Sequence, residues 1–329
     1  MSVAVAHRVS VDDLLGSAEG RFFSEGFRRV FQDVAEVRVV VEQGRASASA
    51  QTVLSYPADW SLKDSRVIVP HLSTVDAFVV SAQLVEAILA VGGVSQERRR
   101  AAWINHAEFR AGAAAQGVEE KIPSYASMSG AYPATRQGWS QLSFDCRVGP
   151  IQVTITALVE TDGLKDSSSE SLSICDLLGA GNDRLYGSGY RTRHHNIGDI
   201  MMTGNSATAA HIMVEGAAPL RDLGGDHAAG VSMVDCLLAQ AQLSQILLLS
   251  LDDLKRSEAY TMWMRRVMMS VAHPAAPQLD GSEAMVRVTS HRLVTLRGER
   301  WRIADFCGQF SNIASEFNLA HRLPGQVVS

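Results

Sequence analysis

A short glycine-rich segment, Gly224–Asp235, contains the residues whose types and spacing could do chemistry. It reads Gly-Gly-Asp-His-Ala-Ala-Gly-Val-Ser-Met-Val-Asp and leads into an apolar stretch that is predicted to be a helix. Asp235 follows His227 by eight residues and lies about one turn inside that helix. An imidazole and a buried carboxylate that meet beside a helix N-terminus could act as a general acid–base pair. Amide groups near Gly230 could hold a carbonyl oxygen or an oxyanion, because the first turn of a helix has no internal acceptors for them.

The same segment also has a purely structural interpretation. Asp226 could cap the helix, and His227 could be an ordinary loop residue. Asp235 is harder to explain in this way, because a carboxylate inside an apolar helix is costly unless it is paired or functional. Asp226 is therefore kept as a candidate substrate-binding residue, and His227 and Asp235 as candidate catalytic residues.

An earlier apolar helix, predicted over residues 73–91, has a matching carboxylate at Asp76. The preceding loop is Val-Pro-His-Leu-Ser, and His71 comes five residues before Asp76 rather than eight. The two sites are therefore not expected to be equivalent. Asp76 is a third candidate catalytic residue, and His71 and Ser73 are predicted to line a substrate channel, with a core histidine as the alternative. Two matched buried carboxylates indicate either a functional pair or one structural bond made twice.

Cationic residues precede the first strands of each half of the chain. Two similar octapeptides end at Arg28 and at Arg191, and Arg191 could hold a phosphate, a carboxylate or a polyol, with a solvated strand edge as the alternative. His194, His195 and Asp199 resemble metal ligands by type. Neighbouring side chains on a strand point to opposite faces, however, so we predict no metal site.

The chain contains an internal repeat. Three matches occur in the same order at spacings of 163, 159 and 160 residues: Arg21–Arg28 with Arg184–Arg191, Asp76–Leu84 with Asp235–Leu243, and Trp103 with Trp263. They indicate a duplicated unit of about 160 residues. We predict a first unit over 18–163 and a second over 171–323, with the polar stretch 161–170 as the linker.

Each unit shows the same order of elements. Apolar helices are predicted at 73–91 and 230–250, and both are apolar on most faces, which is typical of helices buried all round. Strands are predicted at 37–41, 46–54, 103–115, 141–148 and 151–160, and then at 194–202, 208–215, 261–272, 284–296 and 300–310. The pattern predicts an α+β protein with a tandem (double) hot-dog fold, in which two bent antiparallel sheets each wrap a buried helix. A doubly wound nucleotide-binding fold is the alternative, but the strand–helix–strand alternation that it needs is missing.

Composition narrows the functional classes. The 329 residues are 46% hydrophobic, which excludes a disordered chain, and 30 Lys and Arg against 35 Asp and Glu argue against nucleic acid as a partner. The longest apolar run, 87–91, is too short to span a membrane, and the apolar run 3–6 before His7 and Arg8 is too short for the core of a signal peptide. No nucleotide or cofactor loop is complete, and the four cysteines are isolated. We expect a cytoplasmic protein without a cofactor or a membrane partner, either a monomer or a homodimer.

Three segments resemble the avirulence protein D family, which is linked to syringolide-type elicitors. They are Arg21-Phe-Phe-Ser-Glu-Gly-Phe, Tyr56-Pro-Ala-Asp-Trp-Ser and Pro70-His-Leu-Ser-Thr-Val-Asp-Ala-Phe-Val-Val, and the likeness extends over about residues 20–320. Residues 226–235 also resemble the hot-dog pattern of A-factor biosynthesis proteins, Asp-His-x-x-Gly followed by an acidic helix residue. That residue is usually Glu, whereas here it is Asp235.

The resemblance implies an acyltransferase or condensing enzyme. Its substrates would be a β-ketoacyl thioester, carried by an acyl carrier protein or coenzyme A, and a hydroxyl of a small polyol (xylulose-like) or of a triose phosphate. The product would be a butenolide or syringolide-type signal. The resemblance gives His227 the role of base, Asp235 or Asp76 that of orienting the acceptor, Gly230 that of the oxyanion site, and Arg191 that of gripping the acceptor or the carrier. Two alternatives remain: a hot-dog thioesterase or dehydratase, and a non-catalytic acyl-ligand binding protein.

Overall fold

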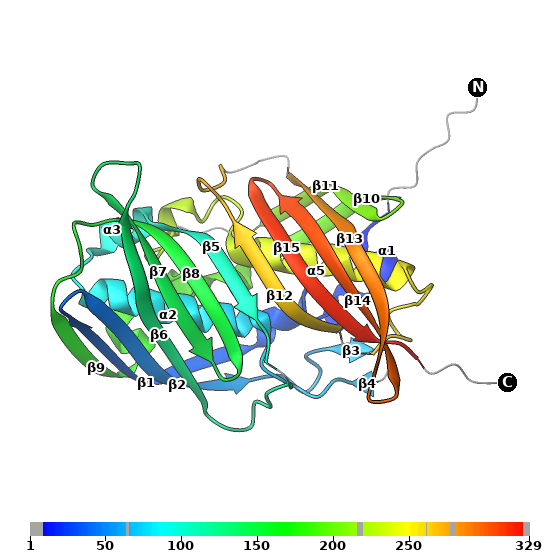
Figure 1. Ribbon diagram of the computed structural model, residues 1–329, viewed down its shortest axis with the longest axis horizontal. Helices are drawn as coiled ribbons and strands as arrows, with labels where there is room; N and C mark the ends of the chain where they lie inside the picture. The colour runs from blue at the N-terminus through cyan, green and yellow to red at the C-terminus, as the bar shows by residue number, and fades with distance from the viewer. Residues whose placement is uncertain are drawn as a thin grey trace.

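The computed structural model describes residues 9–63, 66–112, 114–215, 220–260, 262–276 and 281–324. Over these residues, two long helices, α2 (Thr74–Val91) and α5 (Met233–Ser250), lie behind one large antiparallel sheet (Figure 1). Shorter helices are α1 (Val11–Leu15), α3 (Gln96–Ala101) and α4 (Ile174–Leu178). Two short strands, β3 (Leu62–Lys63) and β4 (Arg66–Val67), pair apart from the main sheet.

The main sheet has thirteen strands among the described residues, in the order β10-β11-β13-β14-β15-β12-β5-β8-β7-β6-β2-β1-β9. The chain up to residue 173 supplies β1 (Phe31–Glu42), β2 (Arg45–Ser55), β5 (Trp103–Arg110), β6 (Ile122–Pro133), β7 (Trp139–Val148), β8 (Ile151–Glu160) and β9 (Ser167–Ser173). The second half supplies β10 (His194–Thr203), β11 (Ser206–Glu215), β12 (Met262–Ser270), β13 (Ser282–Leu296), β14 (Glu299–Phe310) and β15 (Ile313–Arg322). Antiparallel pairing of β12 with β5 joins the two halves.

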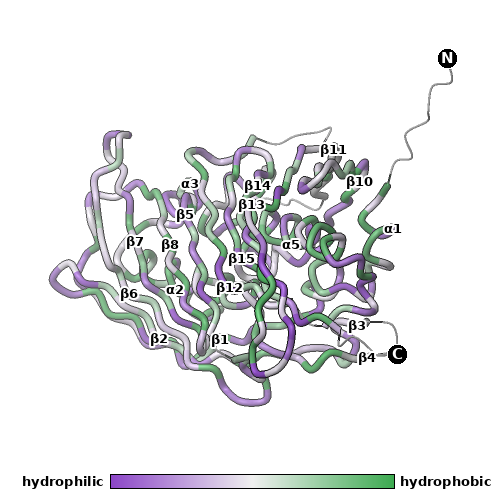
Figure 2. The backbone as a smooth tube through the Cα atoms, turned by 45° about the vertical axis from the view of Figure 1, so that its right-hand side comes forward, coloured by the Kyte–Doolittle hydropathy of each residue, from purple (hydrophilic) through white to green (hydrophobic). Residues whose placement is uncertain are grey.

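Each half of the sheet curves around one helix. Helix α2 contacts β1, β2, β6, β7 and β8, and α5 contacts β10, β11, β13 and β14. Sixteen of the eighteen residues of each helix are buried, and Figure 2 shows much of α5 in the green of hydrophobic residues. The large antiparallel sheet and its buried helices agree with the predicted hot-dog architecture, and the tandem arrangement of two units is confirmed in part.

Both long helices begin at a serine cap. Ser73 and Ser232 accept the amide hydrogen of the third helical residue, Asp76 or Asp235, and that aspartate accepts the serine amide in return. The predicted start of the first helix is therefore confirmed. The second helix begins at Met233, three residues after its predicted start at Gly230, because the chain is extended at the Ser232 cap.

The two long helices also meet the length and mean hydropathy of a membrane span. Within each 18-residue window, however, 89% of the residues are buried inside the structure. This burial explains the apolar pattern on all faces, because each helix is surrounded by its own half of the sheet. The first eight residues, for which the sequence predicts no signal peptide, lie outside the described residues.

The duplication continues into details that the sequence matches did not reveal. Helices α1 and α4 both begin with a Ser-x-x-Asp capping box and end at a glycine with positive φ, Gly16 or Gly179. Glu36 in β1 and Asp199 in β10 are 163 residues apart, and both are non-glycine residues with positive φ. These shared irregularities show that the two units are built on one backbone plan.

A short helix near the start of each half of the chain packs against the long helix of the other half. Helix α1 contacts α5, whereas α4 contacts α2. Strand β9 pairs with β1, so the predicted linker 161–170 is wrong in part, because its second half is an edge strand of the first unit. The division into 18–163 and 171–323 stays a prediction.

Candidate functional site

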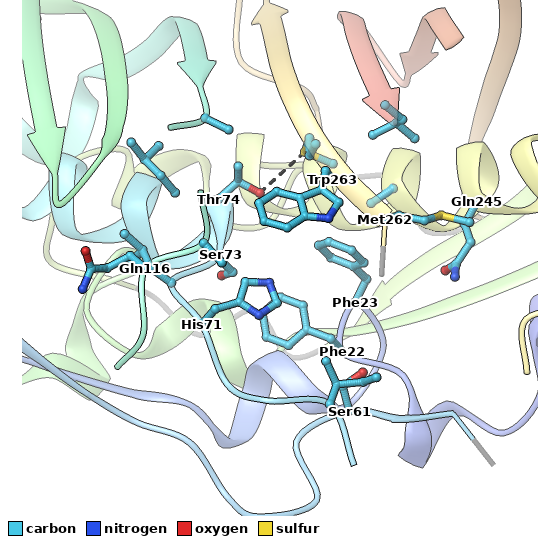
Figure 3. A pocket seen from close by; sticks show the side chains of 18 of the residues that line it. Phe22, Phe23, Ser61, His71, Ser73, Thr74, Gln116, Gln245, Met262 and Trp263 are labelled. Carbon is cyan, nitrogen blue, oxygen red and sulfur yellow. Dashed lines mark hydrogen bonds between the residues drawn. The ribbon is translucent and has the colours of Figure 1, made fainter. Parts of the chain in front are cut away.

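A cavity of about 160 Å³ lies where the N-terminus of α2 faces α5 and β12 (Figure 3). It therefore takes walls from both units. The first unit supplies Arg21, Phe22, Phe23, Trp60, Ser61, Ile68, His71, Leu72, Ser73, Thr74, Ala111, Gly112, Ala114, Ala115, Gln116, Pro150 and Ile151. The second unit supplies Ala241, Gln242, Gln245, Arg256, Met262, Trp263, Met264 and Leu319.

Aromatic and sulfur-containing side chains make most of the cavity apolar. Phe22 packs edge-on against Trp60 with ring centroids 5.1 Å apart. Figure 3 shows Phe22, Phe23 and Trp263 around the centre and Met262 toward Gln245. Such a lining suits an apolar chain, with the few polar groups available to orient a reactive end.

His71 is the titratable side chain best placed for proton transfer. Its Nδ1 lies 3.1 Å from the carbonyl oxygen of Val69, and its ring packs edge-on against Trp60 at 5.4 Å. A carbonyl can only accept a hydrogen bond, so in the neutral ring Nδ1 carries the hydrogen and Nε2 carries the lone pair. No described residue hydrogen-bonds to Nε2. A neutral imidazole in this state can remove a proton from a bound hydroxyl group.

The N-terminus of α2 lies beside His71. Figure 3 shows His71, Ser73 and Thr74 on one side of the cavity. The amides of Thr74 and Val75, in the first turn of α2, have no acceptor within the helix. Together with the positive end of the helix dipole, they form a site that favours negative charge on an oxygen.

Asp76 is buried beneath this end of the helix, and both of its carboxylate oxygens accept hydrogen bonds there. It accepts hydrogen bonds from Ser73 Oγ at 2.5 Å, from Gln32 Nε2 at 2.7 Å and from the Tyr56 hydroxyl. Burial and the charge of Asp76 raise the pKa of Tyr56 well above its ordinary value, so the phenol remains a donor. Asp76 therefore fixes the cap and the surrounding side chains, and it does not line the cavity.

Asp235, the equivalent residue in α5, is held even more firmly. Arg193 donates from Nε at 2.9 Å and from Nη2 at 2.8 Å, and His195 Nε2 lies 2.8 Å from Oδ1. Burial raises the pKa of Asp235, but the charge of Arg193 and the contacts with His195 outweigh it and hold that pKa below its usual range. Asp235 is thus an ionised partner of a buried arginine, with 1% of its surface exposed.

The structure does not bring His227 and Asp235 together as the sequence predicts. His227 Nε2 lies 2.9 Å from the carbonyl oxygen of Ala101, and its ring packs edge-on against Trp103. The predicted acid–base pair is wrong for this reason. In the structural alternative, the cap at Asp226 is wrong as well, because Ser232 caps the helix and Asp226 pairs with Arg100 at 2.5 Å.

Gly230 and Arg191 also have structural partners in place of the predicted ligands. The Gly230 amide donates to His227 O at 3.0 Å, and a side chain there would come within 2.1 Å of the Ala275 carbonyl oxygen. Arg191 donates to Val30 O at 3.0 Å and covers the ring of Phe31. Neither residue lines the cavity described above.

The place beside α5 that corresponds to the cavity is filled by the chain itself. Positions 242 and 245 of α5 correspond to Gln83 and Glu86 of α2. Arg184 donates to Gln83 Oε1 at 3.4 Å, and Arg99 lies 3.4 Å from Glu86. Burial, and then the charge of Asp222, raise the pKa of Glu86 to about 7. Among the described residues, the duplicated fold thus has an open site at the start of α2 and, at the start of α5, a corresponding place where buried side chains pair with one another, here called the filled site.

The buried Glu86 predicts a measurable pH effect. Its folded pKa is raised from 4.5 to about 7, so the unfolded chain loses the proton first. Stability is therefore lost as pH rises between these two values. The variant Glu86→Gln should gain in melting temperature relative to the wild type as the buffer moves from pH 5 to pH 8. The control is Glu160→Gln, at a half-exposed ion pair with Arg98, and its melting temperature relative to the wild type should show no such trend. The explanation would be refuted if the difference in melting temperature between Glu86→Gln and the wild type stayed constant with pH.

Most residues around the open site were not predicted as functional. Trp60 and Phe22 belong to the segments that carry the family resemblance, but their types alone did not mark a site. Gln242 and Gln245 are two of the few polar residues within a mostly apolar helix. The argument applied to Asp235, that a polar group within a buried helix needs a reason, could have identified them.

Comparison with solved structures finds weakly similar folds. The tesB protein of Mycobacterium avium subsp. paratuberculosis is 10% identical with a TM-score of 0.42, over 86% of this chain and 95% of that chain. A conserved hypothetical protein from Mycobacterium tuberculosis, described as having a double hot-dog fold, is 11% identical with a TM-score of 0.41, over 77% and 82%. An acyl-CoA thioesterase II from Mycobacterium marinum is 10% identical with a TM-score of 0.38, over 90% and 97%.

Sequence comparison gives a clearer result. A search of curated proteins finds no significant match. The likeness of residues 226–235 to A-factor biosynthesis proteins stays a prediction. The model of one family, described as Pseudomonas avirulence D protein (AvrD), matches residues 6–324, which is nearly the whole chain. The resemblance predicted from the three sequence segments is confirmed, and the protein belongs to the avirulence D family.

Proposed function

We propose that the protein transfers a β-ketoacyl group from a thioester to a hydroxyl group of a small polyol, in the cavity at the N-terminus of α2. One observation carries the proposal: His71 and the start of α2 at Ser73 and Thr74 line one apolar cavity in a member of the avirulence D family. This location replaces the site predicted around His227 and Asp235, where both side chains have structural partners.

The cavity supplies what each part of the reaction needs. The apolar side chains of Phe22, Phe23 and Met262 provide a surface for the acyl chain. The thioester carbonyl would then lie at the start of α2, with its oxygen toward the amides of Thr74 and Val75. In this pose His71 is the base nearest to a hydroxyl group that approaches the carbonyl carbon.

The chemical step balances without a cofactor. His71 Nε2 takes the proton of the acceptor hydroxyl group while its oxygen forms a bond to the thioester carbon. The tetrahedral oxyanion is stabilised by the α2 amides, and the carbon–sulfur bond then breaks. The leaving thiolate takes the proton from His71, which restores the neutral imidazole and releases an ester and a thiol. Cyclisation of the ester to a butenolide would be a later step.

A thioesterase is the second candidate, because the same histidine and amides would also activate water. The discriminating experiment is mass spectrometry of purified protein with a β-ketooctanoyl thioester, with and without xylulose. The proposal expects a new ester mass that requires both substrates. Free keto acid formed equally in both samples would instead make the protein a thioesterase, and unchanged thioester with saturable binding would make it a binding protein.

A further inference from the structure

Gln242 is a buried polar residue in the wall of the open cavity. It lies on α5, and 1% of its surface is exposed. Its Nε2 donates to the carbonyl oxygens of Phe23 at 2.9 Å and Leu238 at 3.4 Å. Its Oε1 is buried and has no hydrogen-bond partner among the residues that the structure describes.

The orientation of this amide is fixed by its neighbours. Both contacts of Nε2 are carbonyl oxygens, which can only accept, so the NH₂ group must occupy that side. Oε1 is left as an acceptor that needs a donor. A buried acceptor without a partner is unfavourable, and a ligand hydroxyl group that reaches it would remove that cost. An acyl chain has no donor to offer.

The filled site shows what the open site lacks. There the equivalent Gln83 is satisfied internally, because Arg184 donates to its Oε1. The equivalent arginine of the open site is Arg21. It forms an ion pair with Asp12 and donates a hydrogen bond to the Val11 carbonyl oxygen instead. The duplicated chain has thus kept the glutamine in both sites, but it supplies an internal donor in only one of them.

We propose that Gln242 binds and orients the acceptor, by accepting a hydrogen bond from one of its hydroxyl groups. This inference rests on the proposed acyl transfer and deepens it. Gln242 is then a specificity residue that favours a polyhydroxyl acceptor, which can bind its Oε1 with one hydroxyl group while another reacts. Its position on α5, opposite the start of α2, means that the second unit recognises the acceptor while the first unit supplies His71.

The test separates the acceptor from the donor. With β-ketooctanoyl thioester and xylulose as substrates, Gln242→Met should raise the KM for xylulose about tenfold, because one hydrogen bond to a buried group is lost. The KM for the thioester should stay within about twofold. Gln83→Met removes the equivalent amide from the filled site and is the matched control, with both KM values unchanged. Equal effects of Gln242→Met on both substrates, or no effect on xylulose, would overturn the inference while leaving the transfer itself established.

A second measurement needs no variant and protects the test against a folding defect. The wild-type protein is assayed with monodeoxy analogues of xylulose, each lacking one hydroxyl group. At least one analogue should show a KM raised about tenfold, because Oε1 then remains unpaired in the complex. If every analogue that still reacts has the KM of xylulose, Gln242 has no such role. If the wild type forms no ester with xylulose at all, the proposed function fails and this inference fails with it.

Discussion

Replacing Asp235 with asparagine is expected to lower the free energy of unfolding by about 3–5 kcal/mol, the typical cost of removing one partner from a buried ion pair. The substitution hardly changes the volume, so the loss comes from the charge. Arg193 has 2% of its surface exposed, and without Asp235 its charge would be buried with only carbonyl oxygens nearby. Urea unfolding at pH 7 measures the effect directly.

The matched control is Asp226→Asn, because Asp226 pairs with Arg100 in a partly exposed ion pair. A surface pair of this kind contributes about 1 kcal/mol or less. The folded pKa of Asp235 is lowered, so its contribution is present above the ordinary pKa of 3.8 and is lost as pH falls through the folded value. The difference in free energy of unfolding between the wild type and Asp235→Asn should therefore be largest at pH 7 and become smaller at acidic pH. Equal losses for the two variants at pH 7 would contradict the structural role of Asp235.

Replacing His71 with alanine is expected to lower kcat for acyl transfer by about 10²–10⁴-fold, the range typical of a lost general base. The KM for the thioester should change little, because the apolar wall remains in place. The control is His227→Ala, which removes an imidazole from the filled site, where it contacts the Ala101 carbonyl oxygen and Trp103. That variant should keep its turnover within about twofold of the wild type.

Initial rates of ester formation at saturating thioester decide between the two histidines. Circular dichroism and melting temperatures of both variants establish that they are folded. If His227→Ala loses turnover while His71→Ala keeps it, the catalytic site lies in the second unit, as the sequence alone predicted. If both keep their rates, neither His71 nor His227 acts as the base.

The sequence predicts the architecture well because the fold depends on strong local patterns. The two helices are apolar on all faces and have serine caps, and they are found at 74–91 and 233–250. Strands β6 and β15 were missed. Strand β6 buries small or polar residues such as Ser124 and Ala126 and contains Gly130, so its hydrophobic alternation is weak. In β6 the pairing with β2 and β7 determines the strand more than the residue types do.

The site could be predicted only in part because its partners are distant in sequence. Arg193, just before β10, and His195, within β10, contact Asp235 from about forty residues earlier, and no local motif shows that this carboxylate is already neutralised. The Gly-Asp-His segment carries more recognisable residue types than the loop before Asp76, and it therefore attracted the functional interpretation. His71 and Ser73 were expected to line a channel, and the structure places both in the wall of the cavity.

The central claim is that the acyl chain binds at the N-terminus of α2 and not at that of α5. The most direct test is photolabelling with a β-ketooctanoyl thioester analogue that carries a diazirine at the end of its chain, followed by peptide mapping. We expect the label on Phe22, Phe23 or Met262–Met264, and we expect unlabelled β-ketooctanoyl thioester to compete it away. The account would be contradicted by competable label on Trp103 or on residues 227–235, with no label on the peptides that contain Phe22, Phe23 and Met262–Met264. That result would show that the acyl chain binds at the filled site.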